Sequence, residues 1–135
     1  MLYMGNIQGQ IPKKANFEDV QHAIHTKTTL LNTLPLKNQE CLIKTTIHAT
    51  DEEDVINALL QYSKSSRIII YGKNANEECT LHKYKQLNML GFDNVFVYLG
   101  GLFEWLLLQD IYGKDEFPTT KNELDMLKYK APRMK

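Results

Sequence analysis

The sequence predicts an α/β domain in which helices cover both faces of a parallel sheet. Short apolar runs rich in β-branched residues alternate with stretches of helical periodicity, and the links between them are short. This order is typical of βαβ units, whose strands are parallel. The run at 67–71 is apolar after its first residue, as expected for a central strand buried on both faces. The length of 135 residues fits one domain with a core of its own.

Residues 1–16 contain glycine, proline and lysine without periodicity, so we expect an extended arm there. A helix is predicted over 17–24, with Asn16 as its N-cap. Two β-branched runs follow, at 28–34 and 41–47, and we interpret both as strands.

The next elements are predicted by their end signals. Thr50 and Glu53 have the spacing of a capping box, in which each side chain bonds the other's backbone, so a helix should continue to Tyr62. The strand at 67–71 comes next. A helix over 76–90 then precedes Gly91, a typical C-cap residue.

The last predicted elements are a strand at 94–98, a turn at 100–101 and a helix at 102–108. A second capping box, Thr120 to Glu123, should begin a short C-terminal helix. We therefore divide the chain into three parts, which are an N-terminal arm (1–16), a main domain (17–118), and a C-terminal helix with a basic tail (119–135).

Composition limits the classes of partner. The 16 Lys and Arg residues balance the 16 Asp and Glu residues, so no overall field favours nucleic acid or an anionic membrane, and we expect neither as a partner. Cys41 and Cys79 are too few for a disulfide framework, which indicates free thiols in a reducing compartment. The first residues have no secretory pattern. We therefore expect an intracellular, cytoplasmic location.

We expect no metal and no cofactor. His22 and His25 are three residues apart, but with Cys41 and His48 they form no recognised ligand spacing. Glycine-rich dinucleotide and phosphate motifs are missing from the sequence.

Two segments, 68–77 and 91–105, together resemble the second half of a rhodanese-like domain. That family commonly has a Gly-Gly pair after its last core strand and a Trp four residues beyond the second glycine. Gly100, Gly101 and Trp105 match that spacing. The resemblance implies a central parallel sheet of five strands, flanked by helices on both faces.

The resemblance also implies an altered active site. In catalytic members, the position of Gly72 is a cysteine that carries sulfur, and an Arg commonly follows after four intervening residues. This sequence has Gly72 and Glu77 at these positions. Thiosulfate sulfurtransferase activity is therefore not expected. The degenerate loop, a candidate anion site, consists of Gly72, Lys73, Asn74, Ala75, Asn76 and Glu77. Glycine flexibility at 72 and helix capping by Asn76 explain the same residues without function.

The first half of the chain matches the family poorly. Asn32 stands where the family usually has Asp, and no Arg follows it two residues later. Cys79 is the only cysteine near the loop. It falls inside the predicted helix, where we expect a buried or half-buried structural thiol.

The leading hypothesis is a non-catalytic rhodanese-like module that binds a protein partner or regulates one. The apolar run Leu106–Leu108 beside Phe103 is a candidate interface. Two alternatives remain open, which are a sulfurtransferase with Cys79 as nucleophile and an anion-binding module that uses the 72–77 loop.

Overall fold

The structure is a computed structural model that describes residues 11–134. In this part of the chain, five parallel strands form one sheet in the order β1-β5-β4-β2-β3, which confirms the expected sheet. The strands are β1 (Lys14–Ala15), β2 (Thr29–Asn32), β3 (Thr46–Ile47), β4 (Ile68–Tyr71) and β5 (Val95–Tyr98).

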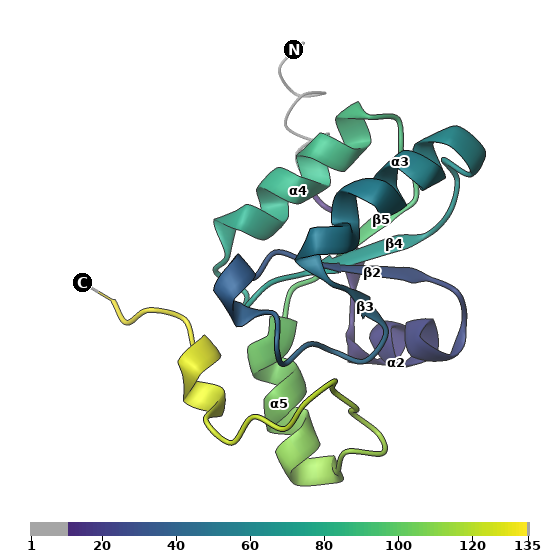
Figure 1. Cartoon of the computed structure of the whole chain (residues 1–135). Coiled ribbons are helices and arrows are strands. Elements are labelled where there is room, and N and C mark those ends of the chain that lie inside the picture. Colours follow the sequence, from purple (N-terminus) through teal and green to yellow (C-terminus); the bar gives the residue numbers. More distant parts are fainter. Residues whose placement is uncertain (1–10, 135) are drawn as a thin grey trace.

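Helices cover both faces of the sheet (Figure 1). Helices α3 (Glu52–Tyr62) and α4 (Glu78–Met89) lie on one face, and α2 (Phe17–His25) and α5 (Gly101–Tyr112) lie on the other. Short 3₁₀ turns complete the structure at Leu36–Asn38, Ala49–Asp51 and Met126–Tyr129. Among residues 11–134, no helix has both the length and the apolar character needed to cross a bilayer.

The central strand β4 divides the core into two clusters. All four of its side chains are buried. Because successive strand residues point to opposite faces, Ile68 and Ile70 pack towards α3 and α4, whereas Ile69 and Tyr71 pack towards α2 and α5. The prediction that this apolar run forms a strand covered on both faces is therefore confirmed.

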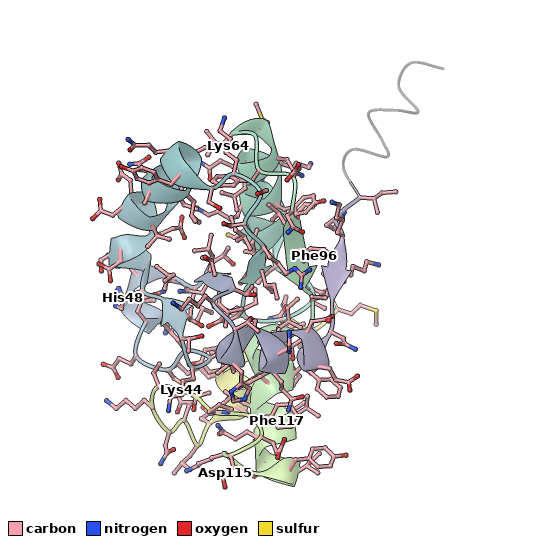
Figure 2. All side chains as sticks on the ribbon, turned by 90° about the vertical axis from the view of Figure 1, so that its right-hand side faces the viewer. Lys44, His48, Lys64, Phe96, Asp115 and Phe117 are labelled. Carbon is pink, nitrogen blue, oxygen red and sulfur yellow. The ribbon has the colours of Figure 1, made fainter. Side chains whose placement is uncertain are left out.

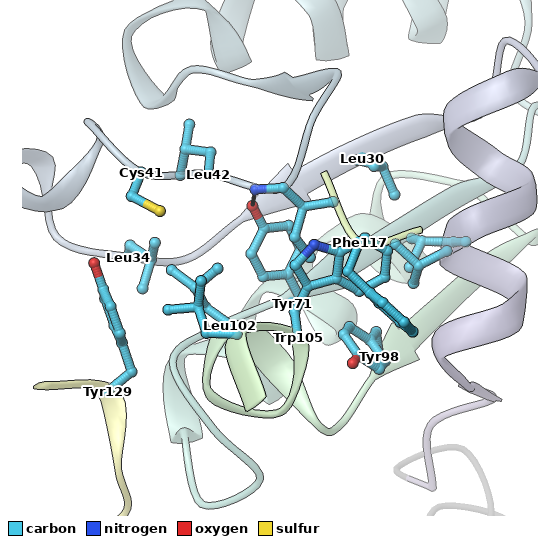
Figure 3. Packing of buried hydrophobic residues seen from close by; sticks show 14 of the residues in the cluster. Leu30, Leu34, Cys41, Leu42, Tyr71, Tyr98, Leu102, Trp105, Phe117 and Tyr129 are labelled. Atoms are coloured by element: carbon cyan, nitrogen blue, oxygen red, sulfur yellow. Dashed lines mark hydrogen bonds between the residues drawn. The ribbon is translucent and has the colours of Figure 1, made fainter. Parts of the chain in front are cut away.

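Trp105 is the centre of the cluster on the α5 side (Figure 3). Its side chain is fully buried, and its ring lies 5.0 Å from that of Phe117 and 6.2 Å from that of Tyr98 in edge-on arrangements. The indole Nε1–H donates to the Pro118 carbonyl oxygen at 3.2 Å. Trp105 thus packs back on the sheet and joins α5 to the segment that follows it.

Part of the expected arm belongs to the sheet. Residues 1–10 lie outside the described part of the chain, but Lys14 and Ala15 pair with Val97 and Tyr98 of β5. A strand of two residues has no periodicity that a sequence could reveal.

The strand expected over 41–47 is wrong in most of its length, because only Thr46–Ile47 joins the sheet. Thr45 has a positive φ of 71°, which interrupts an extended strand. The backbone before it bonds elsewhere: the Ile43 N–H donates to the Tyr71 hydroxyl, and the Lys44 N–H donates to the Pro118 carbonyl.

Helix capping agrees with the sequence at α2. The Asn16 side chain accepts from the Asp19 N–H at 3.0 Å, and the Asp19 carboxylate accepts from the Asn16 N–H at 2.9 Å. The capping box at Thr50 is wrong, because Thr50 lies inside a 3₁₀ turn and α3 begins after Asp51.

The capping box at Thr120 is also wrong. The Thr120 hydroxyl donates to the Glu40 carbonyl and accepts from the Leu42 N–H, which joins the C-terminal segment to residues 40–42. The expected C-terminal helix is one 3₁₀ turn, Met126–Tyr129.

Candidate functional site

The loop after β4 begins at Gly72, which is buried beneath two threonine hydroxyls. A β-carbon at position 72 would lie 2.6 Å from the Thr80 Oγ1 and 2.8 Å from the Thr33 Oγ1. These hydroxyls bond each other at 3.0 Å, and that of Thr33 also contacts the Tyr71 carbonyl at 3.4 Å. A cysteine at position 72 would therefore meet a hydroxyl pair where its β-carbon should stand.

The Asn74 side chain lies within the loop and is largely buried. Its Oδ1 accepts from the Asn76 N–H at 2.9 Å, and its Nδ2 donates to the Tyr129 carbonyl at 2.8 Å. The first contact closes an Asx turn, and the second joins the loop to the C-terminal segment. The sequence suggested Asn76 as the N-cap of α4, and this prediction is wrong. Glu77 occupies the N-cap position without a side-chain bond.

Two loop carbonyls bind the beginning of α5. The Leu102 N–H donates to the Gly72 carbonyl at 2.9 Å, and the Phe103 N–H donates to the Lys73 carbonyl at 2.8 Å. These N–H groups belong to the first turn of a helix, where no intrahelical partner exists. Because they are bonded to the loop, these two N–H groups at the positive end of α5 are not free to bind an anion.

Gly101 makes this close contact possible. It has a φ of +68°, and a β-carbon there would lie 2.7 Å from the Gly72 carbonyl oxygen and 2.9 Å from the Asn74 nitrogen. Gly100 differs, because the three atoms nearest its β-carbon position belong to the flexible Glu104 side chain. The fold therefore requires a glycine at the second position of the pair, Gly101.

Two buried tyrosines stand at the ends of β4 and β5. Burial in the cluster of Figure 3 raises the pKa of Tyr71, although its hydroxyl accepts from the Ile43 N–H and bonds the Thr46 hydroxyl. Burial and the nearby charge of Glu104 raise the pKa of Tyr98. Both phenols therefore stay neutral across the physiological range and supply no base at the site.

Asn32 ends β2 and forms a neutral amide pair with Gln39. The Gln39 Nε2 donates to the Asn32 Oδ1 at 2.8 Å, and the Asn32 Nδ2 donates to the Gln39 Oε1 at 3.0 Å. Both side chains are buried, and the Gln39 Oε1 also accepts from the Ala49 N–H at 2.9 Å. At the position where the family usually has Asp, this chain therefore has a buried, uncharged amide that bonds Gln39.

A cavity of about 260 Å³ lies beside the loop, between the start of α4 and strand β5. Its described lining includes Glu77 and Glu78 and no cationic side chain. The apolar residues Leu81, Val97 and Leu99 form much of the rest. This lining disfavours an anionic ligand.

The two cysteines occupy different environments. Cys79 is exposed on α4, so the expected buried or half-buried position is wrong. Cys41 is buried and donates to the Lys121 carbonyl at 3.3 Å. Burial and the nearby charge of Glu123 raise the pKa of the Cys41 thiol, which disfavours a reactive thiolate there.

The sequence pointed to positions 72 and 77 but not to the residues that fill the space around Gly72. Thr33 and Thr80 are 47 residues apart and belong to no motif of the loop. The Asx turn at Asn74 could have been predicted from the sequence, because Asn side chains in loops commonly bond the backbone N–H two residues later.

The fold and this loop define the class of protein: a parallel α/β domain in which the loop after the central strand packs on a Gly-Gly turn. The family model for the rhodanese-like domain matches residues 12–108. The match covers most of the chain, and the chain belongs to the rhodanese-like domain family. A comparison with curated proteins finds no match.

Solved structures share this fold. The Alr3790 protein from Anabaena sp. has 22% identity and a TM-score of 0.57, and the match covers 83% of each chain. The solution structure of the rhodanese-like domain from the same Anabaena protein has 18% identity and a TM-score of 0.55, over 93% of this chain and 96% of that one. A thiosulfate sulfurtransferase from Pseudomonas aeruginosa has 17% identity and a TM-score of 0.57, over 71% of this chain and 19% of that one.

Proposed function

We propose that this chain is a non-catalytic rhodanese-like domain that acts by binding another protein. The observation that carries the proposal is the surroundings of Gly72. The position has no thiol, and the hydroxyls of Thr33 and Thr80 fill the space that a β-carbon would need. Sulfur transfer in this family requires a persulfide on a cysteine at that position, so the loop lacks both the nucleophile and the room for it.

Charge supports the same proposal. Glu77 stands where an Arg commonly binds the anionic sulfur donor, and Glu78 adds a second carboxylate to the adjoining cavity. Like charges repel, so a thiosulfate or sulfate ion is disfavoured here. The same repulsion disfavours the 72–77 loop as an anion-binding site.

The exposure of Cys79 favours one alternative, a sulfurtransferase with a displaced nucleophile. The test is thiocyanate formation by the intact protein from thiosulfate and cyanide, beside a known rhodanese. We expect the rate of the buffer alone. Turnover that disappears in Cys79→Ser, with the fold intact by circular dichroism, would replace our proposal with this alternative.

The end of α5 is the surface that we propose for partner binding. Leu106 of the expected interface is buried at 2% exposure and belongs to the core. Leu107 and Ile111 lie one turn apart on the same side of α5, and Tyr112 follows, with exposed fractions of 37%, 68% and 64%. Exposed apolar residues in proximity are typical of interaction sites.

This surface has a direct test. Ile111→Ser should lower capture of partners from the source cells by the tagged intact chain, whereas Met89→Ser on α4 should leave capture unchanged. Met89 is the matched control because its side chain is 88% exposed and lies on the other face of the sheet. A chain that remains a strict monomer and captures no partner would contradict the proposal.

A further inference from the structure

A cavity of about 360 Å³ lies at the opposite end of the sheet from the 72–77 loop. Thr28 and Arg67, which line it, stand just before β2 and β4, whereas the loop follows β4. Residues of β1 and α2 close its other sides. The volume falls within the range of about 300–1,000 Å³ that is usual for small-molecule sites.

Two apolar side chains from neighbouring strands line the cavity. Ile69 of β4 is buried at 2% exposure, and Phe96 of β5, labelled in Figure 2, is partly exposed. The register pairs these two residues directly across the sheet. They place two apolar side chains next to each other in an otherwise mostly polar lining, where a flat ligand could lie against them.

Two cations lie near the Phe96 ring, and only one of them is engaged. The Lys13 Nζ is 5.7 Å from the ring centroid and donates to the Asp93 carbonyl at 2.8 Å. The Arg67 Cζ is 5.8 Å from the same centroid, and within residues 11–134 no hydrogen bond or ion pair occupies its guanidinium. A guanidinium presents paired N–H donors that fit a carboxylate.

The other polar groups of the lining fit one negative charge. Lys14 adds a second cation at the rim, and Asp19 adds one carboxylate. The Asp19 Oδ2 already accepts from the Asn16 N–H at 2.9 Å. His22 of α2 contributes a ring beside them. Arg67 and Lys14 against Asp19 leave an excess of one positive charge.

We propose that this cavity binds a small carboxylate with a planar apolar body. The carboxylate would bond the Arg67 guanidinium, and the flat body would cover Phe96 and Ile69. Inorganic phosphate has the charge without the apolar body, so the proposal excludes it as the preferred ligand. The site is independent of the proposed function, because it shares no lining residue with the 72–77 loop.

The test titrates the intact, ¹⁵N-labelled protein with benzoate and follows backbone amide shifts. We expect saturable shifts confined to residues 13–22, 67–69 and 95–97. Acetate and phosphate lack the apolar body, and benzyl alcohol lacks the charge. Each should therefore bind with an affinity about tenfold or more below that of benzoate. Shifts that do not saturate, or that centre on the 72–77 loop, would overturn the proposal.

Variants locate the site. Arg67→Gln should weaken benzoate binding by about tenfold, because the charge-assisted pair is lost. Lys14→Gln should weaken it by a smaller factor. Lys37→Gln should leave it unchanged, because Lys37 is exposed and follows β2, whereas the cavity residue Thr28 precedes β2. Equal affinity of Arg67→Gln and the native protein would overturn the proposal. Lys14→Gln provides a second test if Arg67→Gln disturbs the fold.

Discussion

Gly101 and Gly72 contact each other, but different parts of the molecule exclude a side chain from each. At Gly101 the obstacles are backbone atoms of the 72–74 loop, and φ is positive at +68°. At Gly72 the nearest obstacles are the side-chain hydroxyls of Thr33 and Thr80. Backbone packing belongs to the fold, whereas either hydroxyl is removed by one substitution. The scaffold of the site is therefore hard to change, and its chemistry is easy to change.

The largest effect should come from Gly101→Ala. The new methyl group would overlap the loop backbone and adopt an unfavourable φ, so the free energy of unfolding should fall by about 4 kcal/mol. Gly113→Ala is the control, because Gly113 also has a positive φ (+99°) but open space around it. We expect a loss of about 2 kcal/mol there. Urea unfolding measures both, and equal losses would remove the contrast between the glycines.

Asn74→Ala should have the next largest effect. It removes two bonds and leaves the Asn76 N–H and the Tyr129 carbonyl without their partner, which should lower the free energy of unfolding by about 2–3 kcal/mol. Asn76→Ala, at an exposed position without a capping role, should change it by less than about 0.5 kcal/mol. A larger loss in Asn76→Ala than in Asn74→Ala would restore Asn76 as the residue that orders the loop.

Gly72→Ala should have a smaller effect that depends on its neighbour. Crowding against the Thr80 and Thr33 hydroxyls should cost about 1–2 kcal/mol of unfolding free energy. A Thr80→Ala background removes the nearer of the two hydroxyls and leaves the Thr33 Oγ1 at 2.8 Å, so the two substitutions should couple favourably by about 1 kcal/mol. The double-mutant cycle by urea unfolding measures this coupling. Additive losses would mean that Thr80 does not close the site.

The sequence predicted the elements that depend on local pattern. The apolar run of β4, the Asn16 cap of α2 and the helix that follows the Gly100–Gly101 pair and carries Trp105 each have a signal within a few residues, and the structure confirms them. It did not predict β1 or the irregular path through Thr45. Strand β1 forms by pairing with β5, and the path through Thr45 depends on bonds to the C-terminal segment. A local sequence pattern does not indicate such distant partners.

The candidate site follows the same division. Gly72 and Glu77 were singled out from the sequence, since both lie within one motif, and their interpretation as altered catalytic positions stays a prediction. The residues that occupy the space around Gly72 were not visible, because Thr33 follows β2 and Thr80 lies in α4. Only the fold brings them together.

The most direct test of the account is sulfur transfer from thiosulfate to cyanide in a series of loop variants. The series contains Gly72→Cys alone, Gly72→Cys with Glu77→Arg, and these two with Thr80→Ala, each with its fold checked by near-ultraviolet circular dichroism. We predict no turnover by the single variant, because the thiol is crowded by two hydroxyls and has no cationic partner. Activity should appear when Glu77→Arg is added and rise again with Thr80→Ala. Equal turnover by the single and combined variants, or turnover by the native chain, would contradict the account.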